Sequence, residues 1–186
     1  MGRRGSSQRG FTLIELLIVV AIIAIIAAIA IPALLRARIA ANESAAIGDM
    51  RTVISGEASY LVANGGYYDG NFACLTTPVD CIPDYPSNGP NFLDSAITGL
   101  VAKSGYARSY AGGETPGGLN LVVSSPSSVT SYVYWATPAS GGQTGIRGFA
   151  ADHSGLICFS PQGEPAATTG SIALLSPGNS CNILQD

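Results

Sequence analysis

The sequence predicts an α+β protein in which a long N-terminal α-helix packs, through its C-terminal half, against an antiparallel β-sheet of about four strands. Three observations lead to this prediction. A charge-free apolar run occupies Leu16–Leu35. The chain then keeps an apolar repeat at helical spacing. Its later part carries short runs of β-branched and aromatic residues, which favour strands.

The apolar run is long enough to cross a membrane. At ~1.5 Å per residue, residues 16–35 span about 30 Å, which is the thickness of the hydrocarbon core of a bilayer. Three arginines precede the run and two follow it: Arg3, Arg4 and Arg9, then Arg36 and Arg38. This excess predicts a cytoplasmic N-terminus.

The helix is expected to continue past Arg36 as an amphipathic segment and to span about residues 12–63. Its expected buried stripe recurs at spacings near three and four and comprises Ile39, Ala46, Met50, Val53, Ile54, Ala58 and Leu61. The sequence Asn64-Gly65-Gly66 predicts the C-terminal stop, because glycine tolerates the left-handed conformation of a helix cap.

The rest of the chain, residues 65–186, predicts a β-rich head. Residues 65–104 are expected to be irregular, with one short helix at Leu93–Lys103. The expected strands are Tyr106–Ala111, Ser131–Ala136, Ile146–Ala151 and Leu156–Ser160, with Leu119–Val123 as a fifth candidate. Asp152-His153-Ser154-Gly155 predicts a hairpin turn.

The charge balance argues against nucleic acid as a primary ligand. The formal net charge is −3, and loss of the three leading arginines leaves six basic and twelve acidic residues, a net charge of −6. Only 11% of the residues are charged, and the head is rich in glycine, serine, threonine, proline and asparagine. This composition is typical of loops and short strands outside the cell.

The four cysteines predict two disulfides. No CxxC pair is present and His153 is the only histidine, which argues against zinc. Three connectivities exist for four cysteines. We favour Cys74–Cys81 and Cys158–Cys181, because each pair is adjacent in cysteine order.

No catalytic site is expected. Asp152, His153 and Ser154 are the residue types of a hydrolase triad, but consecutive residues do not form its spatial arrangement. The glycine pairs at 112–113 and 117–118 lack the spacing and the lysine of a phosphate-binding loop.

The N-terminus contains an unusual junction. A secretory signal is cleaved after its apolar region, whereas here the attractive junction, Gly10-Phe11, lies before it. The residues Gly10, Phe11, Thr12, Leu13 and Glu15, with the run Leu16–Pro32, resemble the class III signal of type IV pilins and type II secretion pseudopilins.

The resemblance implies a pilin fold and a defined processing route. Prepilin peptidase would remove the leader, residues 1–10, and the new N-terminus at Phe11 would be N-methylated. Residues 11–35 would form the transmembrane and fibre-core half of the helix, residues 36–64 its amphipathic half, and residues 65–186 the head.

Glu15 is an acidic residue at the start of the apolar helix, and its charge requires an explanation. An ionised carboxylate in an apolar helix is costly and requires a partner. The α-amino group of Phe11, created by cleavage, is the expected partner, and the resemblance implies that it belongs to a neighbouring subunit of the fibre. The alternative is a carboxylate that reaches the membrane surface.

Pro32 is the second unusual residue of the helix. It removes a backbone donor and leaves the carbonyl of Ala28 without its usual bond. The expectation is either a simple kink or, as the resemblance suggests, a point where the helix lengthens or melts in a fibre.

The leading functional hypothesis is a structural subunit of a type IV pilus that serves adhesion, motility or related roles. Its implied partners are identical subunits in a helical filament, prepilin peptidase, the inner-membrane assembly platform and motor ATPases. It would be single-pass in the bacterial cytoplasmic membrane before assembly and on the cell surface afterwards. The alternatives are a pseudopilin of type II secretion and a membrane-anchored binding domain or enzyme that does not assemble.

No cofactor is expected, with calcium left open. The major pseudopilins that this helix resembles carry a calcium loop in the head. The acidic candidates here are Asp80, Asp84, Asp94 and Asp152, although they form no compact acidic loop in the sequence.

Overall fold

The structure, a computed structural model, describes residues 10–161, 163 and 182–184. The chain divides into two compact units, Met1–Ala37 and Arg38–Asp186.

Helix α1 occupies Leu13–Ala63, which confirms the predicted long helix. It ends as expected at two glycines: Gly65 and Gly66 have φ of +65° and +91°, and the N–H of Gly66 donates to the carbonyl of Leu61 at 2.8 Å. Glycine adopts these angles more readily than residues with a side chain.

The buried stripe of α1 differs from the predicted one. Apart from Gly56, its members follow one another at alternating spacings of four and three: Ile39, Glu43, Ala46, Met50, Val53, Glu57 and Tyr60. Ala58 is exposed, and Ile54 and Leu61 are only half-buried. The prediction was wrong there because it counted apolar residues alone, whereas two glutamates occupy positions of the same stripe.

The main sheet has five antiparallel strands in the order β2-β4-β5-β6-β7. Their bounds are β2 Tyr106–Gly112, β4 Tyr132–Pro138, β5 Gly148–Asp152, β6 Ile157–Ser160 and β7 Asn182–Ile183. The four predicted strands are present, and β7 adds a short edge strand. The predicted turn at 152–155 joins β5 to β6, where the N–H of Gly155 donates to the carbonyl of Asp152 at 3.0 Å.

One predicted element is absent and another is shorter than predicted. Leu119–Val123 is a turn, because the side chain of Asn120 accepts from the N–H of Val122 at 3.1 Å and its carbonyl accepts from the N–H of Val123 at 3.1 Å. Asparagine favours such local turns. The predicted helix Leu93–Lys103 is reduced to α2, Ser95–Thr98, since the backbone turns to a φ of +51° at Leu100.

The remaining elements are short. Strands β1 (Tyr68–Asp69) and β3 (Ser128–Val129) form a separate two-stranded antiparallel sheet. Two 3-10 helices, η1 (Phe72–Leu75) and η2 (Pro78–Asp80), follow β1.

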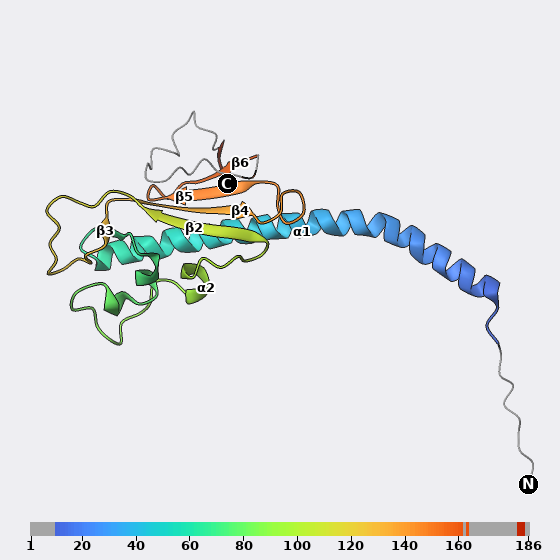
Figure 1. The fold of residues 1–186 in the computed structure, drawn as a ribbon, viewed down its shortest axis with the longest axis horizontal. Coiled ribbons are helices and arrows are strands. Elements are labelled where there is room, and N and C mark those ends of the chain that lie inside the picture. Colours follow the sequence, from blue (N-terminus) through green and yellow to red (C-terminus); the bar gives the residue numbers. More distant parts are fainter. Residues whose placement is uncertain (1–9, 162, 164–181, 185–186) are drawn as a thin grey trace, which may run out of the picture. The chain divides into compact units, whose positions relative to one another are not determined.

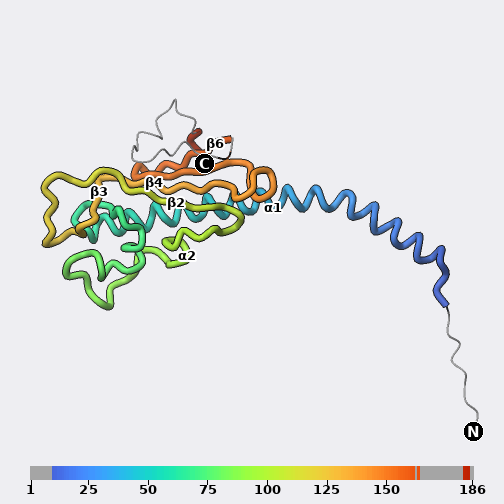
Figure 2. The backbone as a smooth tube through the Cα atoms, in the orientation of Figure 1, coloured from blue at the N-terminus to red at the C-terminus, as the bar shows by residue number. Residues whose placement is uncertain are grey.

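The core of the second unit lies where the C-terminal half of α1 meets the sheet and the segment that contains η1 and α2. Figure 1 shows the main sheet on one side of this half of the helix and α2 on the other, and the chain trace in Figure 2 shows the same arrangement. One hydrophobic cluster joins Met50 and Tyr60 of α1, Leu75 of η1, and Tyr134 and Phe149 of the sheet.

Candidate processing and assembly site

The junction between Gly10 and Phe11 is open to solvent. The side chain of Phe11 is 76% exposed. A Cβ atom placed on Gly10 would have no neighbouring atom within 4 Å. Both residues precede the first residue of α1, Leu13, so the peptide bond that joins them lies in non-helical chain. A protease that recognises this junction therefore has access to it in the described structure.

Thr12 and Glu15 form a reciprocal cap at the start of α1. The N–H and the hydroxyl of Thr12 donate to Oε2 of Glu15 at 2.9 and 2.6 Å. The N–H of Glu15 donates in return to Oγ1 of Thr12 at 3.3 Å. This is a capping box, in which two backbone donors that the helix leaves unpaired are satisfied by side chains.

The capping box gives Glu15 a role that the sequence analysis did not name, since its carboxylate stabilises its own helix. The signal is visible in the sequence, since Thr12-Leu13-Ile14-Glu15 matches the pattern of threonine followed three residues later by glutamate. The cap leaves Glu15 exposed, so a partner group from outside the chain also has access to it. The expected pairing with the α-amino group of Phe11 stays a prediction.

The first part of α1 presents apolar side chains to its surroundings on all sides. Every residue from Gly10 to Leu35 is exposed, except Ala27, which is half-exposed. Within the described residues, α1 is the one helix long and apolar enough to cross a membrane.

The helix is unbroken at Pro32, and both expectations for that proline remain predictions.

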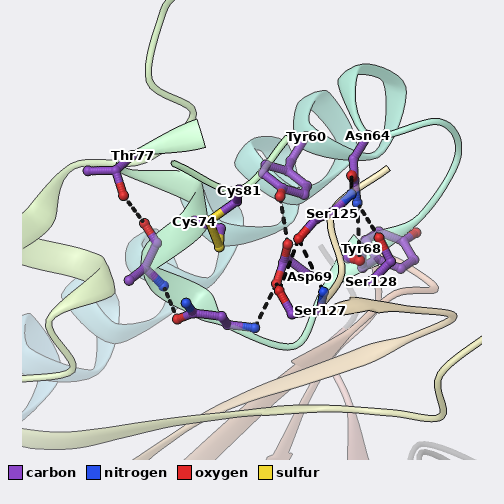
Figure 3. Close-up of a disulfide and its surroundings, with 12 residues drawn as sticks. Tyr60, Asn64, Tyr68, Asp69, Cys74, Thr77, Cys81, Ser125, Ser127 and Ser128 are labelled. Atoms are coloured by element: carbon purple, nitrogen blue, oxygen red, sulfur yellow. Dashed lines mark hydrogen bonds between the residues drawn. A yellow bond between two sulfur atoms is a disulfide. The ribbon is translucent and has the colours of Figure 1, made fainter. Parts of the chain in front are cut away.

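The predicted disulfide between Cys74 and Cys81 is present. The two Cα atoms lie 5.7 Å apart, and the bridge joins η1 to the residue that follows η2 (Figure 3). Cys158 is fully buried on β6. Its predicted partner, Cys181, lies outside the described residues. The next residue along the chain, Asn182, pairs with Phe159, which is compatible with the predicted second bridge.

Asp69 is the centre of a polar cluster beside the first disulfide. Its Oδ2 atom accepts from the hydroxyl of Tyr60 at 2.6 Å, and Oδ1 accepts from the hydroxyl of Ser127 at 2.6 Å and from the N–H of Asn71 at 2.8 Å (Figure 3). The carbonyl oxygen of Asp69 accepts from the hydroxyl of Tyr110 at 2.6 Å. Asp69 therefore ties α1, β1, β2 and the segment before β3 together.

Glu43 and Arg147 form a second link between α1 and the sheet. One carboxylate oxygen of Glu43 accepts from the N–H groups of Ile146 and Arg147, each at 3.1 Å. The other accepts from Nε and Nη2 of Arg147 at 2.9 and 2.7 Å. Burial favours the neutral acid, but these bonds and the charge of Arg147 outweigh it and lower the pKa of Glu43.

Two of the four acidic candidates for calcium have other local roles. Asp94 caps α2 by accepting from the N–H of Ala96 at 2.7 Å, and Asp152 accepts from the N–H of Ser154 at 2.9 Å within the hairpin turn. Asp84 lies at a backbone φ of +56°, and Asp80 is at the end of η2. Among the described residues, no group of three acidic, histidine or cysteine side chains lies together as a metal site requires.

Comparison with a family of known proteins points to the N-terminal region. The family described as the prokaryotic N-terminal methylation motif matches residues 5–31. The chain is 40% identical over 75 residues to the type IV wide pilus major component PilA4 of Thermus thermophilus. That match covers 40% of this chain and 57% of the relative, so the chain spans little more than half of the relative's length. No solved structure matches.

These findings agree with the geometry of the N-terminus and with the α+β arrangement of a long helix followed by antiparallel sheets. The methylation motif and the pilin homologue together support the assignment of this chain to the type IV pilin family.

Proposed function

We propose that this chain is a structural subunit of a type IV pilus, processed at Gly10-Phe11 and polymerised through the first half of α1. The methylation motif and the pilus homologue support a pilus or pseudopilus subunit. The observation that carries the proposal is the combination of that motif with an open junction at the head of an uncovered apolar helix. Adhesion and motility are roles that such a filament would serve.

The apolar helix supplies the driving force for assembly. Outside a membrane its exposed leucine, isoleucine and valine side chains are unfavourable, and their burial contributes about 25 cal/mol per Å² of apolar surface. A bundle of identical helices, each displaced along one axis, buries this surface for every copy. Because such a contact does not close on itself, the assembly grows as a filament.

The proposed processing leaves two opposite charges at the end of this helix. Cleavage after Gly10 creates an α-amino group on Phe11, four residues before Glu15. In the apolar core of a filament a single charge would be strongly unfavourable, whereas a carboxylate and an ammonium group compensate each other. We assign the partner amine to the neighbouring subunit, which would fix the axial register of the filament.

Intact mass tests the proposed processing and location. The chain is recovered from a sheared cell-surface fraction and weighed with and without reduction. We expect a mass that lacks residues 1–10, carries one N-methyl group and gains four hydrogens on reduction, two for each of the two disulfides. A trimmed chain found only in the membrane pellet would favour the pseudopilin, and an untrimmed chain there would favour the plain anchor.

Substitutions at the capping box separate the two roles of Glu15. Glutamine also serves at this position of a capping box, so Glu15→Gln keeps the helix cap and removes the charge. We expect Glu15→Gln to insert into the membrane and be processed but to form no filaments. The matched control, Thr12→Ala, weakens the same cap and keeps the charge, and should retain filaments. Normal filaments from Glu15→Gln would show that the charge does not set the register.

A further inference from the structure

Glu57 is a buried residue of the head, and no neighbouring group donates a hydrogen bond of normal geometry to its carboxyl group among the described residues. It lies on the buried stripe of α1 and is 0% exposed. Neither of its carboxyl oxygens has a hydrogen-bond partner of normal geometry among the described residues. An ionised carboxylate in such a place would bear the full cost of leaving water.

The groups that face Glu57 are acids and phenols. They come from its own helix and from three strands: Tyr60 on α1, Tyr68 and Asp69 on β1, Tyr110 on β2 and Tyr132 on β4. None of them is a cation. A negative charge on Glu57 would therefore meet the carboxylate of Asp69 with no positive charge to compensate either of them.

Three of the neighbouring hydroxyl groups direct their hydrogens away from Glu57. Tyr60 donates to Oδ2 of Asp69 at 2.6 Å, and Tyr68 donates to the carbonyl of His153 at 3.4 Å. Tyr110 lies beside Glu57 but donates to the carbonyl of Asp69 at 2.6 Å. Because a phenol has a single hydrogen, the oxygen of Tyr110 is left to Glu57 only as an acceptor.

A proton on Glu57 would suit this arrangement. The carboxylic acid would have a hydrogen to donate toward the oxygen of Tyr110, which itself donates to the carbonyl of Asp69, so that α1, β2 and β1 would share one directed chain of bonds. We propose that Glu57 is an uncharged carboxylic acid in the folded head, and that loss of its proton to the solvent loosens the packing of α1 against β1 and β2. The head is thereby a pH-sensitive unit.

The direction of the pH effect follows from the same surroundings. Burial is the largest effect on the pKa of Glu57; the contact with Tyr110 opposes it, the charge of Asp69 adds to it, and the net result raises the pKa to about 8. Since the unfolded chain loses this proton near pH 4.5, the folded state binds one more proton between the two values. The stability of the head should therefore fall as the pH rises from about 4.5 to about 8.

The test uses the full chain in detergent micelles, unfolded with urea between pH 5 and pH 9. For the unaltered chain we expect the unfolding equilibrium constant to rise on the order of a hundredfold or more over this range. Glu57→Gln keeps a neutral donor of the same shape and should abolish most of that rise. Glu43→Gln is the matched control, because it removes a carboxylate from the same stripe of α1 and should leave the alkaline dependence unchanged.

A direct titration keeps the proposal open to refutation if the variant does not fold. In a chain labelled with carbon-13 at the glutamate carboxyl groups, the signal that is absent from Glu57→Gln, or that titrates apart from the others, identifies Glu57. We expect it to report a protonated acid at pH 6. A Glu57 signal that is already ionised at pH 6, or equal pH dependence of Glu57→Gln and the unaltered chain, would overturn the proposal.

Discussion

At the scale of single residues, environment decides the state of two glutamates on one stripe of α1. Glu43 receives four hydrogen bonds, three of them from Arg147, whose guanidinium group lies 5.4 and 5.3 Å from the rings of Phe149 and Phe159. Glu57 receives none of normal geometry among the described residues. The same side chain therefore acts as an anion at one position and as a neutral donor two heptads later.

This contrast predicts the effect of removing the first carboxylate. Glu43→Gln should lower the free energy of unfolding at pH 7 by about 1.5–3 kcal/mol, the usual contribution of hydrogen bonds to a charged group. The lowered pKa of Glu43 means that its contribution is present above about pH 4.5 and is lost as the pH falls through the folded-state value. Urea unfolding at pH 7 and at pH 3 measures both effects.

The control for this prediction is Glu114, an exposed glutamate of the head. Glu114→Gln should change the stability at pH 7 by no more than about 0.5 kcal/mol. If Glu43→Gln were as mild as this control, the contacts of Glu43 with Arg147 would contribute nothing measurable.

At the scale of elements, α1 contains two glycines with different surroundings. A Cβ atom on Gly56 would lie 2.5 Å from Cδ2 of Leu93 and 3.0 Å from the carbonyl oxygen of Phe92. A Cβ atom on Gly48 would have no neighbour within 4 Å. Both glycines weaken the helix by about 1 kcal/mol relative to alanine. Only at Gly56 does the absence of a side chain allow another segment, residues 92–93, to pack closely against the helix.

The two positions make a matched pair of substitutions. Gly56→Ala should destabilise the head by about 1–3 kcal/mol, because the added methyl group must displace packed atoms. Gly48→Ala should stabilise it by about 0.5–1 kcal/mol through helix propensity alone. Thermal unfolding of both variants in micelles checks the signs, and a stabilising Gly56→Ala would mean that the segment at residues 92–93 moves without cost.

At the scale of the whole molecule, the chain is divided between an apolar segment and a folded unit. The first buried residue of α1 is Ile39, and the compact second unit begins at Arg38. Residues 10–35 are exposed apart from half-exposed Ala27, so the buried residues of α1 all belong to the second unit.

A truncation tests this division. A chain of residues 38–186 should dissolve without detergent and unfold in urea in one cooperative transition. Its midpoint should match that of the full chain in micelles, since no buried contact of the head is removed. Loss of the cooperative transition would show that the head depends on the apolar segment for its stability.

The sequence by itself determined the long helix, its glycine stop, the four main strands and the hairpin turn at residues 152–155. These elements depend on local signals, which are periodicity, turn residues and β-preferring side chains. The first disulfide was also predictable, because its two cysteines are close together in the chain. Cleavage at Gly10-Phe11 rests on an equally local signal and stays a prediction. The capping box was equally local, and its pattern was present at Thr12 and Glu15.

Only the tertiary structure decided which polar residues are buried. Glu43 and Glu57 are the residue type that a search for an apolar stripe excludes, yet they occupy it because the sheet places Arg147 against one and Tyr110 against the other. Asp69 likewise acquires its role from Tyr60, Tyr110 and Ser127, of which the last two are distant in the sequence. The physical reason is that the cost of burying a carboxyl group depends on the donors, charges and protons that surround it in space.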